Sequence, residues 1–294
     1  MKKHILSAAV FFLSLLFLRQ VQAADPAGTA EHLRDNMYNA VYEEVSHRFI
    51  LDLPEKTEGA PLVILLPGYG NTAESFRDTV HFEQAANPLG YAAAYVTGAT
   101  DPNAPLSSFG WNSGIGIEGN DDVSFLVWLA AYLQEEYSFD GSRTFAVGFS
   151  NGAFMVHRLA MEAADTFSAC VSVAGLMSAK VWNSRKETND ISFFQITGEK
   201  DDAVPKNRDG SAKYAKDPAI EDVMEYWAAS NKLKKCETEI IGNGSALTKC
   251  QSGRTPKQVW SLFVKNGRHS WPGVKLNGFD TNILILEFLE TVSP

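Results

Sequence analysis

The chain has 294 residues, of which 45% are hydrophobic and 21% are charged, as in ordinary globular proteins. Its formal net charge of −9 at pH 7 argues against nucleic acid and anionic membranes as binding partners. Its cysteines and histidines show no Cys-x-x-Cys or His-x-x-x-His spacing, so the sequence predicts no metal site and indicates no cofactor.

Residues 1–23 have the pattern of a secretory signal peptide. A basic start is followed by an almost wholly apolar run from Ile5 to Leu18, and the small residue Ala23 stands where a signal peptidase would cleave. This run of about 14 residues is short for a transmembrane helix, which needs about 20. We therefore expect the mature protein to be secreted, either extracellular or periplasmic, and to have no membrane contact.

Apolar runs alternate with helix-like segments along the rest of the chain. Strands are predicted, in chain order, at 49–53, 62–66, 91–96, 144–147, 170–173, 193–196 and 259–264, and helices at 121–133, 155–164, 220–229 and 282–291. Runs that are apolar at every position are typical of strands covered on both faces. The alternation predicts an α/β fold with a mostly parallel sheet and helices on both faces, formed by one domain over residues 24–294.

Two of the three cysteines are the natural disulfide pair. Cys236 and Cys250 flank the Asn-Gly-Ser turn at 243–245, and an exported protein meets an oxidising environment. Cys170 lies in an apolar run, so we expect a buried and inert thiol.

Ser150 lies in the sequence Gly-Phe-Ser-Asn-Gly, after the predicted strand 144–147 and before a helix-like segment. This placement is what a nucleophile elbow requires. Gly148 and Gly152 would relieve crowding where strand and helix nearly touch, and the helix N-terminus favours negative charge at the serine. We predict that Ser150 is a nucleophile; the alternative is an ordinary strand-to-helix turn.

A nucleophilic serine needs a base, and in folds with such an elbow the histidine follows the serine along the chain. Only His157 and His269 follow Ser150. His157 lies in the adjacent helical segment, where we expect it to pack. His269 lies in a loop of polar turn residues after the predicted strand 259–264, so we predict His269 as the base.

The acid that holds the histidine should follow a strand between the serine and the histidine. The predicted strand 193–196 is followed by Glu199, Asp201 and Asp202, and all three qualify by placement. The residues by themselves leave these three carboxylates open.

Two backbone N–H groups are expected to bind the oxyanion that develops during acyl transfer. One should come from Asn151, the residue after the nucleophile, and the other from Tyr69 in the Gly-rich loop after the predicted strand 62–66. The alternative for this loop is an ordinary glycine-rich turn.

Together these segments resemble the secreted α/β-hydrolase esterases that include polyhydroxybutyrate depolymerases and feruloyl or acetylxylan esterases. The family's nucleophile motif G-x-S-N-G-G corresponds to 148–152, its acid motif D-x-x-V-P to 201–205, and its base motif G-x-H-x-W-P-G to 267–273. Gly110-Trp111-Asn112 and 121–123 match as well. The resemblance implies the α/β-hydrolase fold and Ser-His-Asp acyl transfer through an acyl-enzyme, and it selects Asp201 as the acid.

The chain departs from this family at several positions. Pro67-Gly68 replaces a common His-Gly, Thr197-Gly198-Glu199 replaces His-Gly-Thr, and Ala153 replaces a second glycine. Backbone donors survive such changes, so the departures bear on the substrate rather than on catalysis.

The expected substrate is a small or oligomeric ester, either a hydroxyalkanoate or a plant-wall ester. Trp111, Trp271 and Tyr69 are candidates for lining a cleft that accepts an aromatic acyl group, with packing or loop anchoring as the alternative for each. A serine peptidase or thioesterase on the same fold and a catalytically silent binding protein are the alternative functions.

Overall fold

The computed structural model describes residues 28–102, 108–115, 117–204 and 216–292. The predicted signal peptide lies outside the described residues.

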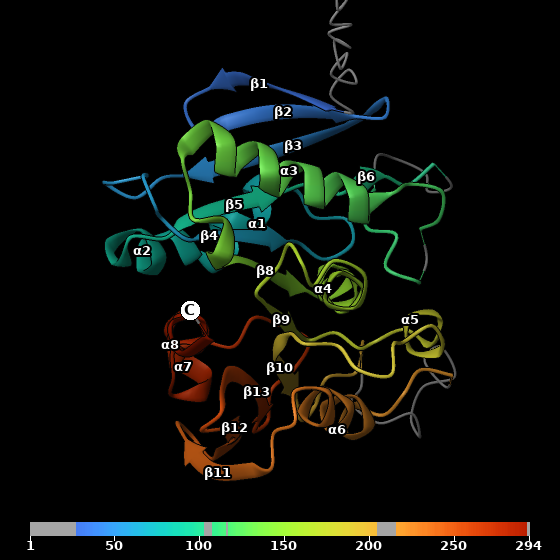
Figure 1. Ribbon diagram of the computed structural model, residues 1–294, viewed down its shortest axis with the longest axis vertical. Helices are drawn as coiled ribbons and strands as arrows, with labels where there is room; N and C mark the ends of the chain where they lie inside the picture. The colour runs from blue at the N-terminus through green and yellow to red at the C-terminus, as the bar shows by residue number, and fades with distance from the viewer. Residues whose placement is uncertain (1–27, 103–107, 116, 205–215, 293–294) are drawn as a thin grey trace, which may run out of the picture.

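Within the described residues, eleven strands form one sheet with the spatial order β1-β2-β3-β5-β4-β8-β9-β10-β13-β12-β11 (Figure 1). Their bounds are β1 (Gly28–Arg34), β2 (Met37–Tyr42), β3 (Val45–Asp52), β4 (Leu62–Leu66), β5 (Ala92–Val96), β8 (Thr144–Phe149), β9 (Ala169–Val173), β10 (Ser192–Gly198), β11 (Lys235–Ile241), β12 (Ser245–Ser252) and β13 (Thr255–Val264). The short strands β6 (Ala99–Thr100) and β7 (Phe109–Gly110) pair separately.

Helices cover both faces of the sheet, as predicted. The helices are α1 (Ala73–Val80), α2 (Phe82–Ala86), α3 (Asp122–Tyr137), α4 (Asn151–Glu162), α5 (Ala179–Asn183), α6 (Ile220–Ser230), α7 (Val274–Asn277) and α8 (Thr281–Val292), with 3₁₀ turns η1 (Asn87–Leu89) and η2 (Gly141–Arg143). Side chains of α3, α4 and α6 form one buried cluster, and those of α1, α2 and α8 form another on the opposite face (Figure 1). Successive residues of β4 alternate between the two clusters, because side chains of a strand point to opposite faces.

The six central strands β5, β4, β8, β9, β10 and β13 are parallel. All six were predicted as strands, and the α/β fold class is confirmed. The antiparallel edge strands β1, β2, β11 and β12 were not predicted. Several of their side chains are exposed, so these strands need little apolar surface and carry a weak sequence signal.

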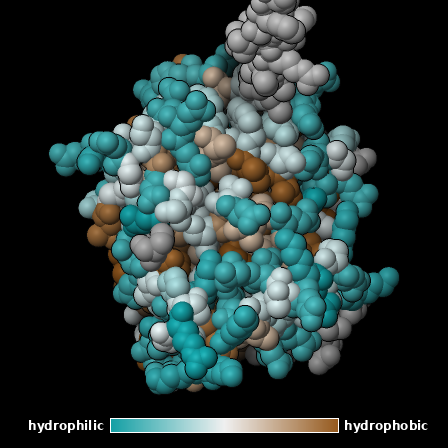
Figure 2. All heavy atoms as spheres, viewed as in Figure 1, coloured by the Kyte–Doolittle hydropathy of each residue, from teal (hydrophilic) through white to brown (hydrophobic). Residues whose placement is uncertain are grey.

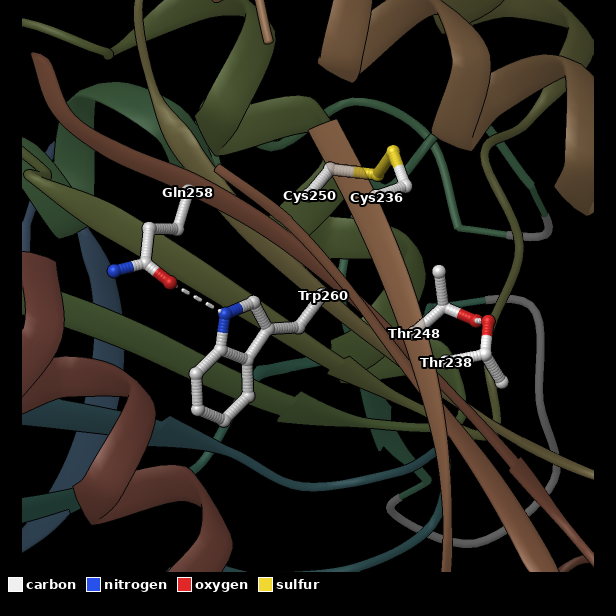
Figure 3. Close-up of a disulfide and its surroundings, with 6 residues drawn as sticks. All are labelled: Cys236, Thr238, Thr248, Cys250, Gln258 and Trp260. Atoms are coloured by element: carbon white, nitrogen blue, oxygen red, sulfur yellow. Dashed lines mark hydrogen bonds between the residues drawn. A yellow bond between two sulfur atoms is a disulfide. The ribbon is translucent and has the colours of Figure 1, made fainter. Parts of the chain in front are cut away.

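The hairpin of β11 and β12 carries the predicted disulfide. Cys236 and Cys250 stand directly opposite each other in the hairpin and are bonded, as Figure 3 shows. On the same hairpin the hydroxyls of Thr238 and Thr248 lie 2.8 Å apart. Cys170 is free and buried, and burial raises the pKa of its thiol, which agrees with the predicted inert role.

The surface is largely polar. Figure 2 shows mainly hydrophilic residues on the face seen in Figure 1, with small hydrophobic areas between them. Among the described helices, none has both the length and the apolar character that crossing a bilayer requires.

Candidate active site

Ser150 occupies a sharp turn between β8 and α4. Its backbone has φ 52° and ψ −116°, a left-handed conformation that residues other than glycine rarely adopt. A Cβ atom at Gly148 would lie 2.1 Å from the carbonyl oxygen of Gly152, and one at Gly152 would lie 2.1 Å from that of Leu66. Only glycine fits at both positions, because strand and helix backbones touch there. The Ser150 N–H donates to the Val173 carbonyl at 3.0 Å and helps hold the turn.

Three side chains from separate loops form a linear hydrogen-bonded array. Ser150 Oγ lies 2.9 Å from His269 Nε2, and His269 Nδ1 lies 2.9 Å from Asp201 Oδ2. Asp201 as a carboxylate can only accept, which assigns the imidazole proton to Nδ1 and leaves Nε2 to accept from the serine hydroxyl. The array therefore has the hydrogen-bond directions needed to deprotonate Ser150.

Asp201 is held rigidly beneath the imidazole. Its side chain is 0% exposed. While one carboxylate oxygen faces His269, the other accepts from the backbone N–H groups of Ala203 at 3.0 Å and Val204 at 2.8 Å. These two bonds stabilise the ionised carboxylate and fix its orientation.

The other two candidate carboxylates point elsewhere. Asp202 is exposed. Glu199 accepts from the backbone N–H of Asn266 at 2.8 Å and pairs with Lys265, and the hydrogen bond from Asn266 lowers the pKa of Glu199. The structure therefore brings only Asp201 to the histidine, which resolves the choice that the residues left open.

The loops that carry the acid and the histidine are joined through their backbones. The Lys200 N–H donates to the Gly267 carbonyl at 2.7 Å. A Cβ atom at Gly198 would lie 2.6 Å from that same carbonyl oxygen, so the contact requires glycine. The His269 ring packs near Phe149 with ring centroids 5.2 Å apart. These contacts hold the loop that carries Asp201 against the loop that carries His269.

Of the two predicted oxyanion donors, Asn151 directly follows Ser150. Asn151 begins α4, where backbone N–H groups have no acceptor within the helix. Its side chain is committed elsewhere, because Oδ1 accepts from the Trp111 N–H at 2.7 Å and Nδ2 donates to Ser113 Oγ at 3.0 Å. Asn151 can therefore offer the oxyanion only its backbone N–H.

The loop after β4 passes close to Ser150. A Cβ atom at Gly68 would lie 3.1 Å from Ser150 Cβ, so Tyr69 begins next to the serine. The Gly70 N–H donates to the Phe109 carbonyl at 2.7 Å, which fixes the loop from behind. Tyr69 is 48% exposed at the surface.

The chain is similar to known hydrolases in sequence and in fold. Residues 111–220, which include Ser150 and Asp201, match the prolyl oligopeptidase family. The protein named "Putative esterase NocK" of Nocardia uniformis subsp. tsuyamanensis is 26% identical over 242 residues, which cover 75% of this chain and 68% of that protein. The "Probable feruloyl esterase C" of Aspergillus clavatus is 25% identical over 203 residues, or 69% and 71% of the two chains. The acetyl xylan esterase from Aspergillus awamori has a similar fold, with a TM-score of 0.61 at 13% identity over 83% of this chain and 94% of that one.

The chain has the α/β-hydrolase fold and is similar to esterases of that fold. In this α/β-hydrolase the elbow serine stands at the carboxyl end of the central strand β8, between the loops after β4 and β10. Parallel strands end at the same edge of a sheet, which is why residues far apart in sequence meet there.

The structure corrects the expectation that Trp111 lines the substrate cleft. Trp111 is 0% exposed, and its Nε1–H donates to the Pro67 carbonyl at 3.1 Å. Trp111 thereby anchors the loop after β4. Loop anchoring was the alternative to lining the cleft that the sequence left open for this residue. Trp271 is only partly buried, packs near Phe76 and donates to Asn282 at 3.1 Å, so it remains a candidate for lining the site.

A buried carboxylate that was not among the predicted site residues, Asp122, holds the segment that follows Trp111. Asp122 begins α3 and accepts from the backbone N–H of Asn112 at 2.6 Å, while Arg158 donates to the Asn112 carbonyl at 2.5 Å. The sequence signal that could have pointed to Asp122 was the match of residues 121–123 to the esterase family. Burial raises the pKa of Asp122 to about 6, although the Asn112 N–H and the charge of Arg158 both lower it.

Replacing Asp122 with asparagine should change the pH dependence of stability. The folded pKa lies above the value of 3.8 expected for an unperturbed aspartate, so the folded state binds more protons between the two values and its stability falls as pH rises through about 6. Asp122→Asn removes this titration. The free energy of unfolding of the variant relative to wild type should therefore increase by about 2 kcal/mol between pH 4.5 and pH 7.5, measured by urea unfolding.

Asp121→Asn is the matched control, because asparagine is as good an N-cap as aspartate and Asp121 is exposed. The change with pH should be larger for Asp122→Asn than for this control. A constant difference between Asp122→Asn and wild type over this pH range would contradict the raised pKa of Asp122.

Proposed function

We propose that this protein is a secreted serine carboxylic-ester hydrolase that works by acyl transfer through an acyl-enzyme. The observation that carries the proposal is the array of Ser150, His269 and Asp201, with 2.9 Å at each of its two hydrogen bonds. Such an array on a strained elbow activates a hydroxyl that is otherwise a weak nucleophile.

In the proposed reaction His269 Nε2 takes the proton from Ser150 as the serine oxygen attacks the ester carbonyl carbon. The buried carboxylate of Asp201 orients the imidazole and stabilises the imidazolium that forms. The backbone N–H groups of Asn151 and Tyr69 hold the oxyanion. The imidazolium then protonates the departing alcohol, and a water molecule repeats the sequence to release the acid and restore Ser150.

We propose a small or oligomeric ester as the substrate, and we favour a plant-wall ester over a hydroxyalkanoate. Relatives named feruloyl esterase and acetylxylan esterase support this choice. The half-exposed Tyr69 and the partly buried Trp271 support an aromatic wall close to the serine. Secretion is supported by the signal-like pattern of residues 1–23 and by the Cys236–Cys250 disulfide.

A substrate panel tests this function. Methyl ferulate, short acetyl esters, 3-hydroxybutyrate oligomers and a prolyl peptide amide are compared at equal concentration, because residues 111–220 match a peptidase family. We expect ester cleavage to exceed amide cleavage, and methyl ferulate or acetyl esters to exceed the hydroxybutyrate oligomers. A fluorophosphonate should label wild type but not Ser150→Ala. Faster cleavage of the peptide amide would instead indicate a peptidase.

A further inference from the structure

The two proposed oxyanion donors lie on separate elements of the fold. Tyr69 lies in the loop after β4, whereas Asn151 begins α4. An oxyanion hole works when both N–H groups lie within about 3 Å of one oxygen, so the separation of the two donors must be fixed before the substrate reacts. Residues 109–111 form a third segment that contacts both donor residues.

The Trp111 indole holds the loop after β4 just before Tyr69. Its Nε1–H donates to the Pro67 carbonyl at 3.1 Å, and Trp111 is fully buried, so water does not compete for this bond. A peptide unit is planar, and the bond therefore fixes the plane of the peptide that follows Pro67. The peptide that carries the Tyr69 N–H is the next one along the chain. Only the two dihedral angles of Gly68 separate the two planes.

The same loop is held again just after Tyr69. The Gly70 N–H donates to the Phe109 carbonyl at 2.7 Å. A Cβ atom at Gly110 would lie 2.9 Å from Cδ2 of the Tyr69 ring, so the ring packs directly on the glycine backbone. The Tyr69 N–H is thus bracketed by contacts with Trp111 and with the two residues before it.

Trp111 holds the second donor residue through its backbone. The Trp111 N–H donates to Asn151 Oδ1 at 2.7 Å, and the Trp111 carbonyl accepts from Asn151 Nδ2 at 3.4 Å. A Cβ atom at Gly110 would lie 3.1 Å from the same Oδ1, so the segment fits closely against this side chain. The amide side chain that Trp111 holds and the backbone N–H proposed to meet the oxyanion belong to one residue.

We propose that Trp111 is a positioning residue that sets the separation of the Tyr69 and Asn151 N–H groups. Its indole holds one donor and its backbone holds the other, so a single residue joins the two halves of the oxyanion hole. The proposal rests on the proposed ester hydrolysis. Loss of the indole N–H releases the Pro67 carbonyl and lets the Tyr69 N–H move, which weakens the hold on the tetrahedral intermediate and leaves binding of the ester as it was.

Trp111→Phe tests the proposal, because it removes the indole N–H and keeps an aromatic ring in the core. We expect kcat for the best ester of the panel to fall about 10²-fold, as for a catalytic group displaced by about 1 Å. KM should stay within about twofold, because acylation and deacylation both pass through an oxyanion and slow together. The pH dependence of kcat/KM should be unchanged, because His269 and Asp201 keep their hydrogen bond. A rise in KM at unchanged kcat, or a shifted pH profile, would contradict the proposed role.

Inhibition by phenylboronic acid provides a second readout. Ser150 Oγ adds to the boron atom and its proton passes to His269, which gives a tetrahedral boronate with one oxygen in the oxyanion position. The inhibition constant should rise at least tenfold in Trp111→Phe. A fall in kcat with unchanged boronate affinity would place the defect outside oxyanion binding and would overturn the proposal.

Trp227→Phe is the matched control. Trp227 lies in α6 and is fully buried like Trp111, but among the described residues its Nε1 has no hydrogen-bond partner. The control therefore makes the same change in the core without the loss of a hydrogen bond, and kcat should stay within about twofold of wild type. Thermal unfolding of both variants measures the cost to stability. Equal kcat in the two variants would refute the positioning role.

Asn151→Ala tests the other half of the link and serves in place of Trp111→Phe should that variant not fold. It keeps the backbone N–H of residue 151 and removes the acceptor of the Trp111 N–H. We expect kcat to fall at least tenfold at unchanged KM, and full activity would contradict the link. Wild-type hydrolysis that Ser150→Ala abolishes establishes the proposed function independently. An active wild type with fully active Trp111 and Asn151 variants would therefore reject the positioning role alone.

Discussion

Replacing Ser150 with alanine is expected to lower kcat for ester hydrolysis by a factor of about 10⁵ to 10⁶. The change removes the only oxygen within 2.9 Å of His269 Nε2 among the described contacts of that atom, so no acyl-enzyme forms. Alanine retains the Cβ atom, and the backbone at φ 52° carries the same strain with either residue. The measurement is single-substrate kinetics on the best ester of the panel, with circular dichroism to establish that the variant is folded.

Ser270→Ala is the control for this result. Ser270 is an exposed serine in the loop that carries His269, and its loss should leave kcat within about twofold of wild type, as for surface substitutions generally. A Ser150→Ala variant that keeps a tenth or more of wild-type activity would rule out Ser150 as the nucleophile.

Asp201→Asn should lower kcat by about 10⁴, whereas Asp202→Asn should have little effect. Asparagine can still accept from the Ala203 and Val204 N–H groups through Oδ1, so the loop keeps its shape. Its Nδ2 then faces His269 and donates to Nδ1, which moves the imidazole proton to Nε2. In that tautomer Nε2 no longer accepts from Ser150, and the base is lost.

The two variants are well matched, because Asp201 and Asp202 are adjacent and both substitutions replace aspartate with asparagine. A difference in activity between them therefore reports the position of the carboxylate. Thermal unfolding of both variants separates a catalytic loss from a loss of stability. Equal activity of Asp201→Asn and wild type, or a comparable loss in Asp202→Asn, would contradict the assignment of Asp201.

The central parallel strands and the elbow at Ser150 could be predicted from local sequence. A parallel strand covered on both faces needs apolar residues at every position, so its signal is present within the strand itself, as for 62–66 and 144–147. The elbow at Ser150 has a similarly local cause, because Gly148 and Gly152 allow a backbone contact within a five-residue turn. The pairing of Cys236 with Cys250 across a short turn is local as well.

The tertiary structure alone decided which side chains lie near Ser150 and His269. Asp201 and Asp202 are neighbours with equal chemistry, and the direction of each depends on the contact of the acid loop with Gly267, far along the chain. Trp111 is buried because the loop that contains Pro67 folds over it, although its composition equally suited a substrate wall. Such directions follow from contacts between distant segments, whereas the amino-acid sequence by itself determined the central parallel strands, the elbow, and the order of Ser150, the candidate acids and His269 along the chain.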